Sequence, residues 1–309
     1  MLQQSDKKMI KDAGIVGTLT VSSRILGFVR DSIIAMFLGA GIYSDAFFTA
    51  FRIPDLFRKL FSDGVLSISF IPIFTQILTR KSRKDAFDMA RSALFLTAIV
   101  GVIALLFFII LTNFLFIESD LTIKLSNIMM PYVLSICIMS IFMGVLNSMG
   151  HFGAPAAAPI LLNLTIIFSV TLFSPLSDQP AVIIAWGVTA GGILQLAVQI
   201  PFILKKGFKF RGQITLFHPD TMRAFKMMLP ALAGTGHYQI NMLVATIMAS
   251  SMTSTFAQGS VSYLYYADRL VQFPLGLFTF SVSTPMFFIR TMDNTKFALI
   301  EIIPPINGI

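Results

Sequence analysis

The sequence predicts an all-α polytopic membrane protein with about eight transmembrane helices. Hydrophobic residues make up 55% of the 309-residue chain and charged residues only 12%, whereas a soluble domain carries about 25% charged residues. Apolar stretches recur along the whole chain, and many are long enough to cross a bilayer, which takes roughly 20 helical residues. The sequence lacks the short segments of alternating hydrophobicity that characterise membrane β-barrels, so helices are the expected spanning elements.

In chain order, we expect spans at about residues 14–38, 46–78, 89–113, 127–149, 156–175, 181–204, 224–249 and 260–288. The second span is long, and a bend is expected at Pro54 and Pro72, because proline removes a helical hydrogen bond. Residues 1–13 are polar and basic, like the start of a signal peptide. The apolar run behind them is too long for a signal peptide, contains charges and lacks a small-residue cleavage site, which predicts a retained first span.

Lysine and arginine residues indicate the orientation of the spans. Sixteen of them fall in segments on one side of the predicted membrane helices, and only Lys124 falls in a loop on the other side. The basic side of a membrane protein faces the cytoplasm, which places the N-terminus there. The formal net charge of +8 is then accounted for by topology, without a nucleic-acid partner, although the basic loops can also contact anionic membrane lipids.

Charged residues inside the spans are concentrated in the first, second and eighth. A charge at the bilayer centre costs at least about 2.5–3.5 kcal/mol, so such residues should face the bundle interior or a watery cavity. Arg24 and Asp31 lie seven residues apart on one face of the first span, and Asp45, Arg52 and Lys59 repeat at the same spacing in the second. The excess of positive charge favours an anionic ligand, and the planar fork of arginine suits phosphate.

The charges inside the spans can instead have a purely structural role. Arg24–Asp31 and Arg52–Asp55 can be internal ion pairs that fix the packing of the helices. Arg58 and Lys59 can extend their long side chains to a membrane interface. A voltage sensor is not favoured, because it requires arginines at three-residue spacing along one helix.

The sequence shows no catalytic, nucleotide-binding or metal-binding pattern. The phosphate-binding loop G-x-x-x-x-G-K-[ST] is absent, which argues against direct use of ATP. His151, His218 and His237 are scattered and lack the spacing of a zinc site. We therefore expect a protein that is not an enzyme and that needs no cofactor or metal.

Several features of the spans favour a transporter. Prolines lie in or beside many of them, and broken helices are typical of transporters. The stretch SDAFFTAFRIPDLF (44–57) is echoed by SVSYLYYADRLVQFPLGLF (260–278), which suggests a six-span repeat in which the eighth span corresponds to the second. Polar residues inside the fifth and sixth spans are expected to form interhelical hydrogen bonds, with the lining of a cavity as the alternative; they are Asn163, Gln195 and Gln199.

Five longer stretches resemble a known family: SSRILGFVRD, GAGIYSDAFFTAFRIPDLFRKLFSDGVLSISFIPIF, NSMGHFGAPAAAPILLN, AWGVTAGGILQLAVQIP and GSVSYLYYADRLVQFPLG. The chain is similar over nearly its whole length to the MurJ (MviN) family of lipid II flippases, within the multidrug/oligosaccharidyl-lipid/polysaccharide exporter superfamily. The resemblance implies transport of lipid II, or a related polyprenyl-pyrophosphate glycolipid, from the inner to the outer leaflet of the cytoplasmic (inner) membrane. That lipid then feeds peptidoglycan synthesis.

The resemblance also implies which residues act. Two six-span lobes of such a transporter enclose a cationic cavity that opens alternately to each side of the membrane. The cavity arginines of the family, which would meet the pyrophosphate, fall on Arg24, Arg30, Arg58 and Arg269, with Arg52 at a position that is basic in relatives. The functional acids of the family's first two spans fall on Asp31 and Asp45, as cavity or gating groups.

The domain organisation that follows is a cytoplasmic N-terminus (1–13), a six-span lobe (14–204), a basic cytoplasmic loop (205–223), two spans of an incomplete second lobe (224–288) and an aberrant C-terminal tail (289–309). The tail does not resemble the family, whose members have further spans. Three hypotheses follow: a flippase or its N-terminal portion, a transport-inactive remnant or half of a split transporter, and an exporter of cationic drugs. The excess of arginine argues against the last, and a stable chain with a half-built lobe would be expected to self-associate.

Overall fold

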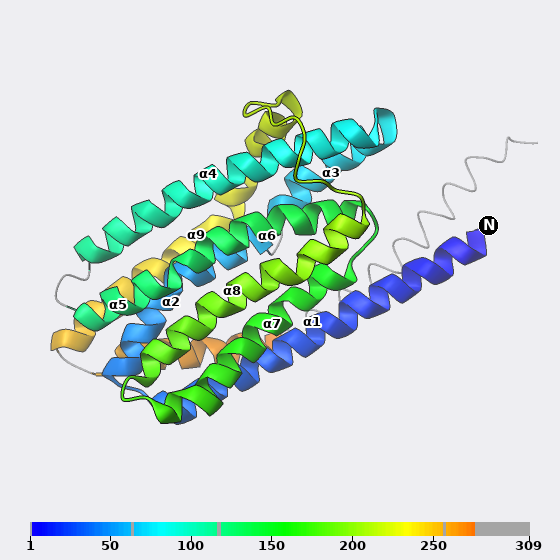
Figure 1. Ribbon diagram of the computed structural model, residues 1–309. Coiled ribbons are helices and arrows are strands. Elements are labelled where there is room, and N and C mark those ends of the chain that lie inside the picture. The colour runs from blue at the N-terminus through cyan, green and yellow to red at the C-terminus, as the bar shows by residue number, and fades with distance from the viewer. Residues whose placement is uncertain (1, 63–64, 116–118, 256–257, 276–309) are drawn as a thin grey trace, which may run out of the picture. The chain divides into compact units, whose positions relative to one another are not determined.

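A computed structural model describes residues 2–62, 65–115, 119–255 and 258–275 of the chain. Within these residues the regular structure is helical, without a β-strand (Figure 1). The chain divides into two compact units, Met1–Tyr266 and Ala267–Ile309, and a helix over residues 260–275 crosses the boundary between them. The predicted all-α class is confirmed, whereas the predicted domain organisation stays a prediction.

The first unit contains most of the described helices. In chain order they are α1 (Leu2–Leu38), α2 (Ile42–Ser62), α3 (Val65–Arg80), α4 (Arg83–Leu115), α5 (Asp120–Met129), α6 (Pro131–Ser148), α7 (Gly153–Phe168), α8 (Pro180–Lys205) and α9 (Pro219–Thr255). A π-helical turn, Ser169–Phe173, and a 3-10 turn, Ser174–Leu176, follow α7 directly. Gly39 after α1 and Gly150 after α6 adopt positive φ angles of 65° and 69°. Glycine ends helices in this conformation because it lacks the Cβ atom that would clash.

Four helical stretches among the described residues are long and apolar enough to cross a membrane: Arg83–Leu115, Asp120–Ser148, Gly153–Leu176 and Pro180–Lys205. They coincide with the predicted third to sixth spans, and the chain is a multi-pass membrane protein. The first and seventh predicted spans, and the described residues of the second, are helical but fall outside this group. In α1, Arg24, Arg30 and Asp31 lower the mean hydropathy of the helix. The total of eight spans stays a prediction, and residues 276–288 of the eighth lie outside the described residues.

Two of the predicted spans each contain two of the described helices. The second, 46–78, contains α2 up to Ser62 and α3 from Val65, and residues 63–64 between them lie outside the described residues. Pro54 lies inside α2 and Pro72 inside α3. The fourth, 127–149, is divided between α5 and α6, and Pro131 is the first residue of α6. Proline is well tolerated there because the amide of the first helical residue has no partner within its own helix.

Helices α1, α7, α8 and α6 lie side by side in this order (Figure 1). Glycine residues bring α8 close to its two neighbours. A Cβ atom on Gly191 would meet Leu162 of α7, and one on Gly192 would overlap the ring of Tyr132 on α6. Small residues at such contacts let the helix backbones approach, which increases van der Waals contact between the helices.

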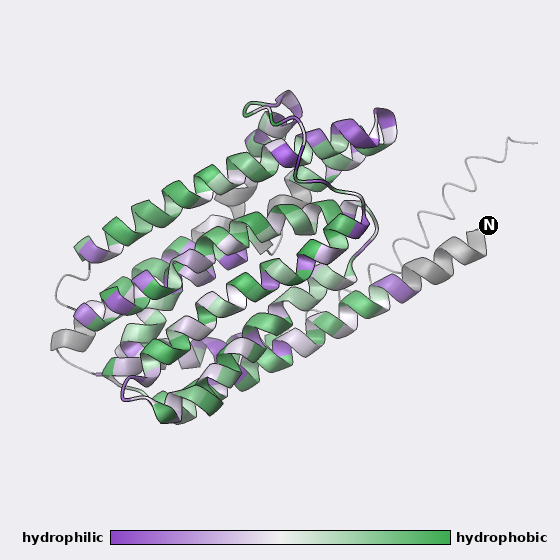
Figure 2. Ribbon diagram, in the orientation of Figure 1, coloured by the Kyte–Doolittle hydropathy of each residue, from purple (hydrophilic) through white to green (hydrophobic). Residues whose placement is uncertain are grey.

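The buried side chains of the first unit form two hydrophobic clusters. One includes Phe47 and Tyr132, and the other includes Phe74 and Met89. The outer face of α4 stays exposed and apolar, as its hydrophobic colouring in Figure 2 shows. An exposed apolar helix face of this length is expected on a protein surrounded by lipid.

Candidate functional site

Arg30 and Asp31 form a buried ion pair on α1. The Nε and Nη2 atoms of Arg30 donate hydrogen bonds to Oδ1 of Asp31 at 2.8 and 2.6 Å. The two side chains are only 7% and 6% exposed. Removing both charges from solvent is costly, so the pair needs further hydrogen bonds to be tolerated.

Asn163 and Tyr265 supply these hydrogen bonds from two other helices. Arg30 Nη1 donates to Oδ1 of Asn163 on α7 at 3.1 Å, and Asn163 Nδ2 donates to the Ser23 carbonyl of α1 at 3.0 Å. The Tyr265 hydroxyl, on the 260–275 helix, donates to Asp31 Oδ1 at 3.3 Å and accepts from Arg30 Nη2 at 3.4 Å. The ion pair therefore joins three helices that are distant in the sequence.

Aromatic side chains of α2 complete the surroundings of this network. The ring of Phe48 stacks on that of Tyr265, with 3.9 Å between the centroids. The guanidinium carbon of Arg30 lies 6.0 Å from the ring centroid of Phe51, within the range of a cation–π contact. These rings exclude water from the ion pair, and a low local dielectric strengthens its electrostatic interactions.

Asp45 on α2 caps the beginning of the 260–275 helix. Its carboxylate accepts hydrogen bonds from the backbone amides of Gly259 and Ser262, each at 2.8 Å, and from the Ser262 hydroxyl. That hydroxyl also lies 2.8 Å from the hydroxyl of Ser44. Amide groups at the start of a helix lack intrahelical partners, and the helix dipole favours a negative charge there. Asp45 thus ties α2 to a helix more than 200 residues later in the chain.

The other charges of α2 lie further along the same helix. Arg52 is buried and donates from Nε to the Thr246 hydroxyl of α9 at 2.8 Å. Asp55 accepts from Nη2 of Arg58 at 2.7 Å and pairs with Nζ of Lys59 at 3.0 Å. Two cations, Arg58 and Lys59, therefore lie beside the buried carboxylate of Asp55.

The two remaining predicted site residues differ from these. Arg24 is exposed on α1, and within the described part of the chain it makes no hydrogen bond or ion pair. Arg269 belongs to the second compact unit and is partly buried on the 260–275 helix. The structure thus brings Arg30 and Asp31 together, whereas a common cavity for all the predicted arginines stays a prediction.

The sequence suggested Arg24–Asp31 and Arg52–Asp55 as ion pairs that fix the packing, and both of these predictions are wrong. Asp31 pairs with its neighbour Arg30 instead of Arg24, because two helical turns separate residues 24 and 31 by about 10 Å along the axis. Asp55 pairs with Arg58 instead of Arg52. Helical side chains lean toward the N-terminus, so a residue three or four positions after Asp55 reaches back to it and one before it leans away.

Two of the three polar residues in the fifth and sixth predicted spans form the interhelical hydrogen bonds that were expected. Asn163 joins α7 to α1, and Gln195 Nε2 on α8 donates to the Ala158 carbonyl of α7 at 2.8 Å. Gln199 is fully buried and has no hydrogen-bond partner among the described residues. Sequence reasoning missed Tyr265, Thr246 and Ser262, because only the tertiary fold places these residues beside charged groups.

Comparisons with known proteins agree with this geometry. The family model described as "Lipid II flippase MurJ" matches residues 34–288. A probable lipid II flippase MurJ of Buchnera aphidicola subsp. Acyrthosiphon pisum is 36% identical over 298 residues, covering 90% of this chain and 56% of that protein. One of Bdellovibrio bacteriovorus is 34% identical over 302 residues, covering 92% and 56%. The chain thus spans about half the length of these curated relatives.

Solved structures of membrane transporters have the same fold. A structure titled as lipid II flippase MurJ in an inward closed conformation superposes with a TM-score of 0.69 at 29% identity, covering 87% of this chain and 57% of that one. An outward-facing multidrug resistance MATE family transporter of the MOP superfamily gives a TM-score of 0.62 at 18% identity, covering 84% and 60%, which concerns the fold alone. Because the family model matches most of its residues, the chain belongs to the lipid II flippase MurJ family.

Proposed function

We propose that this chain binds lipid II, or a related polyprenyl-pyrophosphate glycolipid, and takes part in flipping it across the cytoplasmic membrane by alternating access. The observation that carries the proposal is the buried Arg30–Asp31 pair, on which α1, α7 and the 260–275 helix meet. Because the pair bonds to three helices, a change in its partners changes the contacts between them. The names of the similar proteins suggest the substrate.

In this proposal the pyrophosphate exchanges with Asp31 as the partner of Arg30. A guanidinium makes the same bidentate hydrogen bonds to a phosphate as to a carboxylate. The exchange keeps an anion beside a buried cation and avoids the cost of leaving that cation unpaired. Arg24, which is exposed on the same helix, would make the first contact with the substrate, and Arg52, Arg58 and Arg269 would add positive charge to the cavity.

Asp45 is the acid to which we assign a gating role. Its hydrogen bonds to Gly259 and Ser262 hold α2 against the start of the 260–275 helix. Separation of these two helices would break those bonds and leave the amides of a helix end without partners. The cap therefore favours the closed arrangement of this end of the bundle, and transport would require its release.

The orientation completes the proposal. We infer that the N-terminus lies in the cytoplasm, because sixteen lysine and arginine residues fall on that side of the predicted spans and one falls on the other. The basic end of the bundle would then meet the substrate where the lipid-linked precursor is made, at the inner leaflet.

Flipping is tested by complementation. The 309-residue chain is expressed in cells depleted of their own lipid II flippase, insertion is checked by immunoblotting, and growth is scored. We expect growth with the wild type and with Arg223→Gln, which neutralises an exposed arginine of α9, and loss of growth with Arg30→Gln. Growth of cells with Arg30→Gln as fast as cells with the wild type would refute a role for the ion pair in transport.

Binding is tested separately by photo-crosslinking of a lipid II probe to the purified chain. Wild type and Arg223→Gln should crosslink equally, and Arg24→Ala and Arg30→Gln several-fold less. Crosslinking without growth identifies a chain that binds the substrate but does not flip it alone, as expected for a remnant or half of a split transporter. If neither Arg24→Ala nor Arg30→Gln reduces the crosslinking, the proposed binding site is wrong.

A further inference from the structure

A cavity of about 790 Å³ lies between the beginning of α4 and the segment that follows α8. Its walls contain six basic residues: Arg83, Lys84, Arg91, Lys205, Lys209 and Arg211. Among the described residues that line it, Asp88 is the acidic one, and Asp88 is paired with Arg91. This basic pocket is separate from the Arg30–Asp31 network and plays no part in the proposed transport step.

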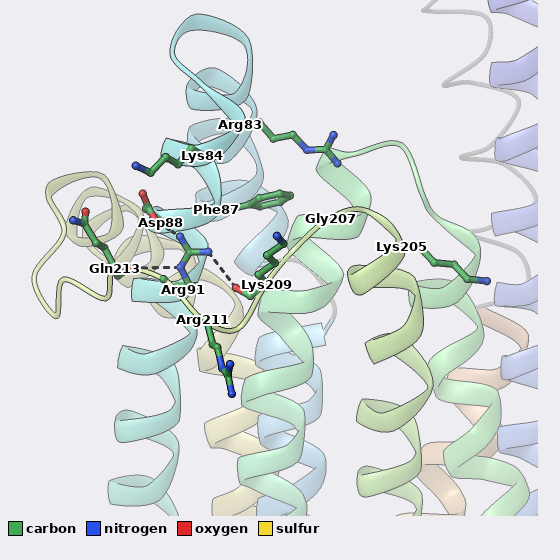
Figure 3. Close-up of a pocket in the computed structure, with 11 residues that line it drawn as sticks. Arg83, Lys84, Phe87, Asp88, Arg91, Lys205, Gly207, Lys209, Arg211 and Gln213 are labelled. Carbon is green, nitrogen blue, oxygen red and sulfur yellow. Dashed lines mark hydrogen bonds and ion pairs between the residues drawn. The ribbon is translucent and has the colours of Figure 1, made fainter.

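Two of the six cations hold the pocket together. Arg91 donates from Nη1 to the Lys209 carbonyl at 3.1 Å and from Nε to the Gln213 carbonyl at 3.5 Å (Figure 3). Arg83 donates from Nη2 to the Lys206 carbonyl. A side chain on Gly212 would overlap the guanidinium of Arg91, so glycine permits this close approach. Arg83 and Arg91 therefore fix the segment after α8 onto α4.

The other four cations are exposed, and within the described part of the chain they make no hydrogen bond or ion pair through their side chains; they are Lys84, Lys205, Lys209 and Arg211. In Figure 3 the side chains of Lys84, Lys205 and Arg211 point away from Arg91 in different directions. A single small anion would need cations that converge on one point. The spread of these four suits a larger anionic group at a surface, or several such groups side by side.

Apolar side chains accompany these cations on the same segment. Phe210, Ile214 and Phe217 are 46%, 50% and 66% exposed, although large apolar residues are usually buried. The exposed apolar face of α4 begins at Phe95, only one helical turn, about 6 Å, beyond Arg91. Basic residues interleaved with exposed aromatic and aliphatic side chains at the end of a membrane helix are typical of a segment that lies in the interface of a bilayer.

We propose that the basic pocket and residues 205–217 bind the phosphate headgroup of an anionic phospholipid. Lys84, Lys205, Lys209 and Arg211 would contact the headgroup phosphates, while Phe210, Ile214 and Phe217 would lie among the first carbons of the acyl chains. The apolar side chains favour a lipid over a soluble phosphate compound, because a soluble anion would leave them in water. The site is independent of the proposed flipping activity.

Native mass spectrometry of the full chain, with added phosphatidylglycerol or phosphatidylcholine, tests this proposal. The pocket variant carries Lys84, Lys205, Lys209 and Arg211 changed to Gln. The matched control loses the same charge elsewhere, with Lys11, Arg80, Arg223 and Lys226, which are all exposed, changed to Gln. Each basic residue near an anionic lipid surface contributes roughly 1 kcal/mol, or about fivefold in affinity. We expect the preference for phosphatidylglycerol to fall at least about tenfold in the pocket variant and less than about twofold in the control.

Three results would overturn the proposal: no preference for phosphatidylglycerol in the wild type, equal losses in the two variants, or full competition by millimolar inorganic pyrophosphate. The last would identify a site for a soluble anion. If the pocket variant with four substitutions does not fold, as judged by its thermal midpoint, the double variant Lys84→Gln/Lys209→Gln replaces it. That variant should still lose several-fold in preference, and an unchanged preference would contradict the assignment.

Discussion

Asn163 of α7 accepts a hydrogen bond from Arg30 of α1 across 3.1 Å, and with its amide nitrogen it donates to Ser23 of the same helix. One side chain thus bonds α1 at two points two helical turns apart. Gly27 lies between them, and a Cβ atom there would stand 3.6 Å from the Asn163 amide nitrogen, an ordinary contact. The position of the buried arginine is therefore fixed from α7 as well as from its own helix.

Replacement of Asn163 by Leu should destabilise the chain. The substitution leaves the Arg30 Nη1 donor and the Ser23 carbonyl without this partner, and a buried unsatisfied group costs about 1–3 kcal/mol. Unfolding of the purified chain in mixed detergent micelles, followed by circular dichroism, measures the change. Asn113→Leu is the control, because Asn113 of α4 bonds mainly to the Ile109 carbonyl of its own helix. Equal effects of the two substitutions would contradict a cross-helix role for Asn163.

Arg30 and Asp31 should behave as a coupled pair in a double-mutant cycle. Asp31→Asn leaves a buried cation uncompensated, and removing one partner of a buried pair costs about 3–5 kcal/mol. Arg30→Gln likewise leaves the buried carboxylate of Asp31 without a compensating charge. The double variant Arg30→Gln/Asp31→Asn should lose less than the sum of the two single losses, because two neutral amides can bond to each other and to Tyr265.

The same unfolding assay measures this cycle. A coupling free energy of at least about 1 kcal/mol is expected for contacting residues. Strictly additive losses would show that the two side chains do not stabilise each other in the folded protein. The corresponding cycle of Lys81 with Asp220, an exposed pair 3.2 Å apart, should give a coupling of about 0–1 kcal/mol.

The sequence pattern predicted much of the fold because hydrophobic length is a local property. The third to sixth predicted spans coincide with four helical stretches that can cross a membrane. The break of the fourth predicted span at Met130, between α5 and α6, was not predicted, although Pro131, the first residue of α6, is visible in the sequence.

The candidate site was predictable only in part. Charges in an apolar run indicate residues that must find partners, which singled out Arg30, Asp31 and Asp45. The partners themselves come from helices up to 235 positions away, as Tyr265 does for Arg30, and no local pattern contains that information. Motif resemblance located the residues, and the tertiary structure supplied their geometry.

Gly192 should be intolerant of even a methyl group. A Cβ atom there would overlap the ring of Tyr132, which is fully buried between α6 and α8. Gly192→Ala must therefore push α8 away from α6, and overpacking of this kind costs about 1–3 kcal/mol. Gly14→Ala is the control, because Gly14 lies in α1 with nothing within 4 Å of the added atom. Alanine there should be neutral or stabilise the helix by about 0.5–1 kcal/mol. A lower thermal midpoint for Gly14→Ala than for Gly192→Ala would contradict this packing.

Asp45 should stabilise the first turn of the 260–275 helix. Asp45→Ala removes the acceptor of the Gly259 and Ser262 amides, and loss of a helix cap costs about 0.5–2 kcal/mol. Hydrogen–deuterium exchange of the peptide over residues 258–266 should speed up about two- to thirtyfold, which corresponds to that free energy. Asp45→Asn keeps an acceptor but loses the favourable charge at the helix start, so its exchange should lie between those of wild type and Asp45→Ala. Exchange of a peptide from α8 serves as the control and should not change. If Asp45→Ala speeds up exchange in α8 as much as in residues 258–266, the carboxylate supports the whole bundle, and a local gating role for it is excluded.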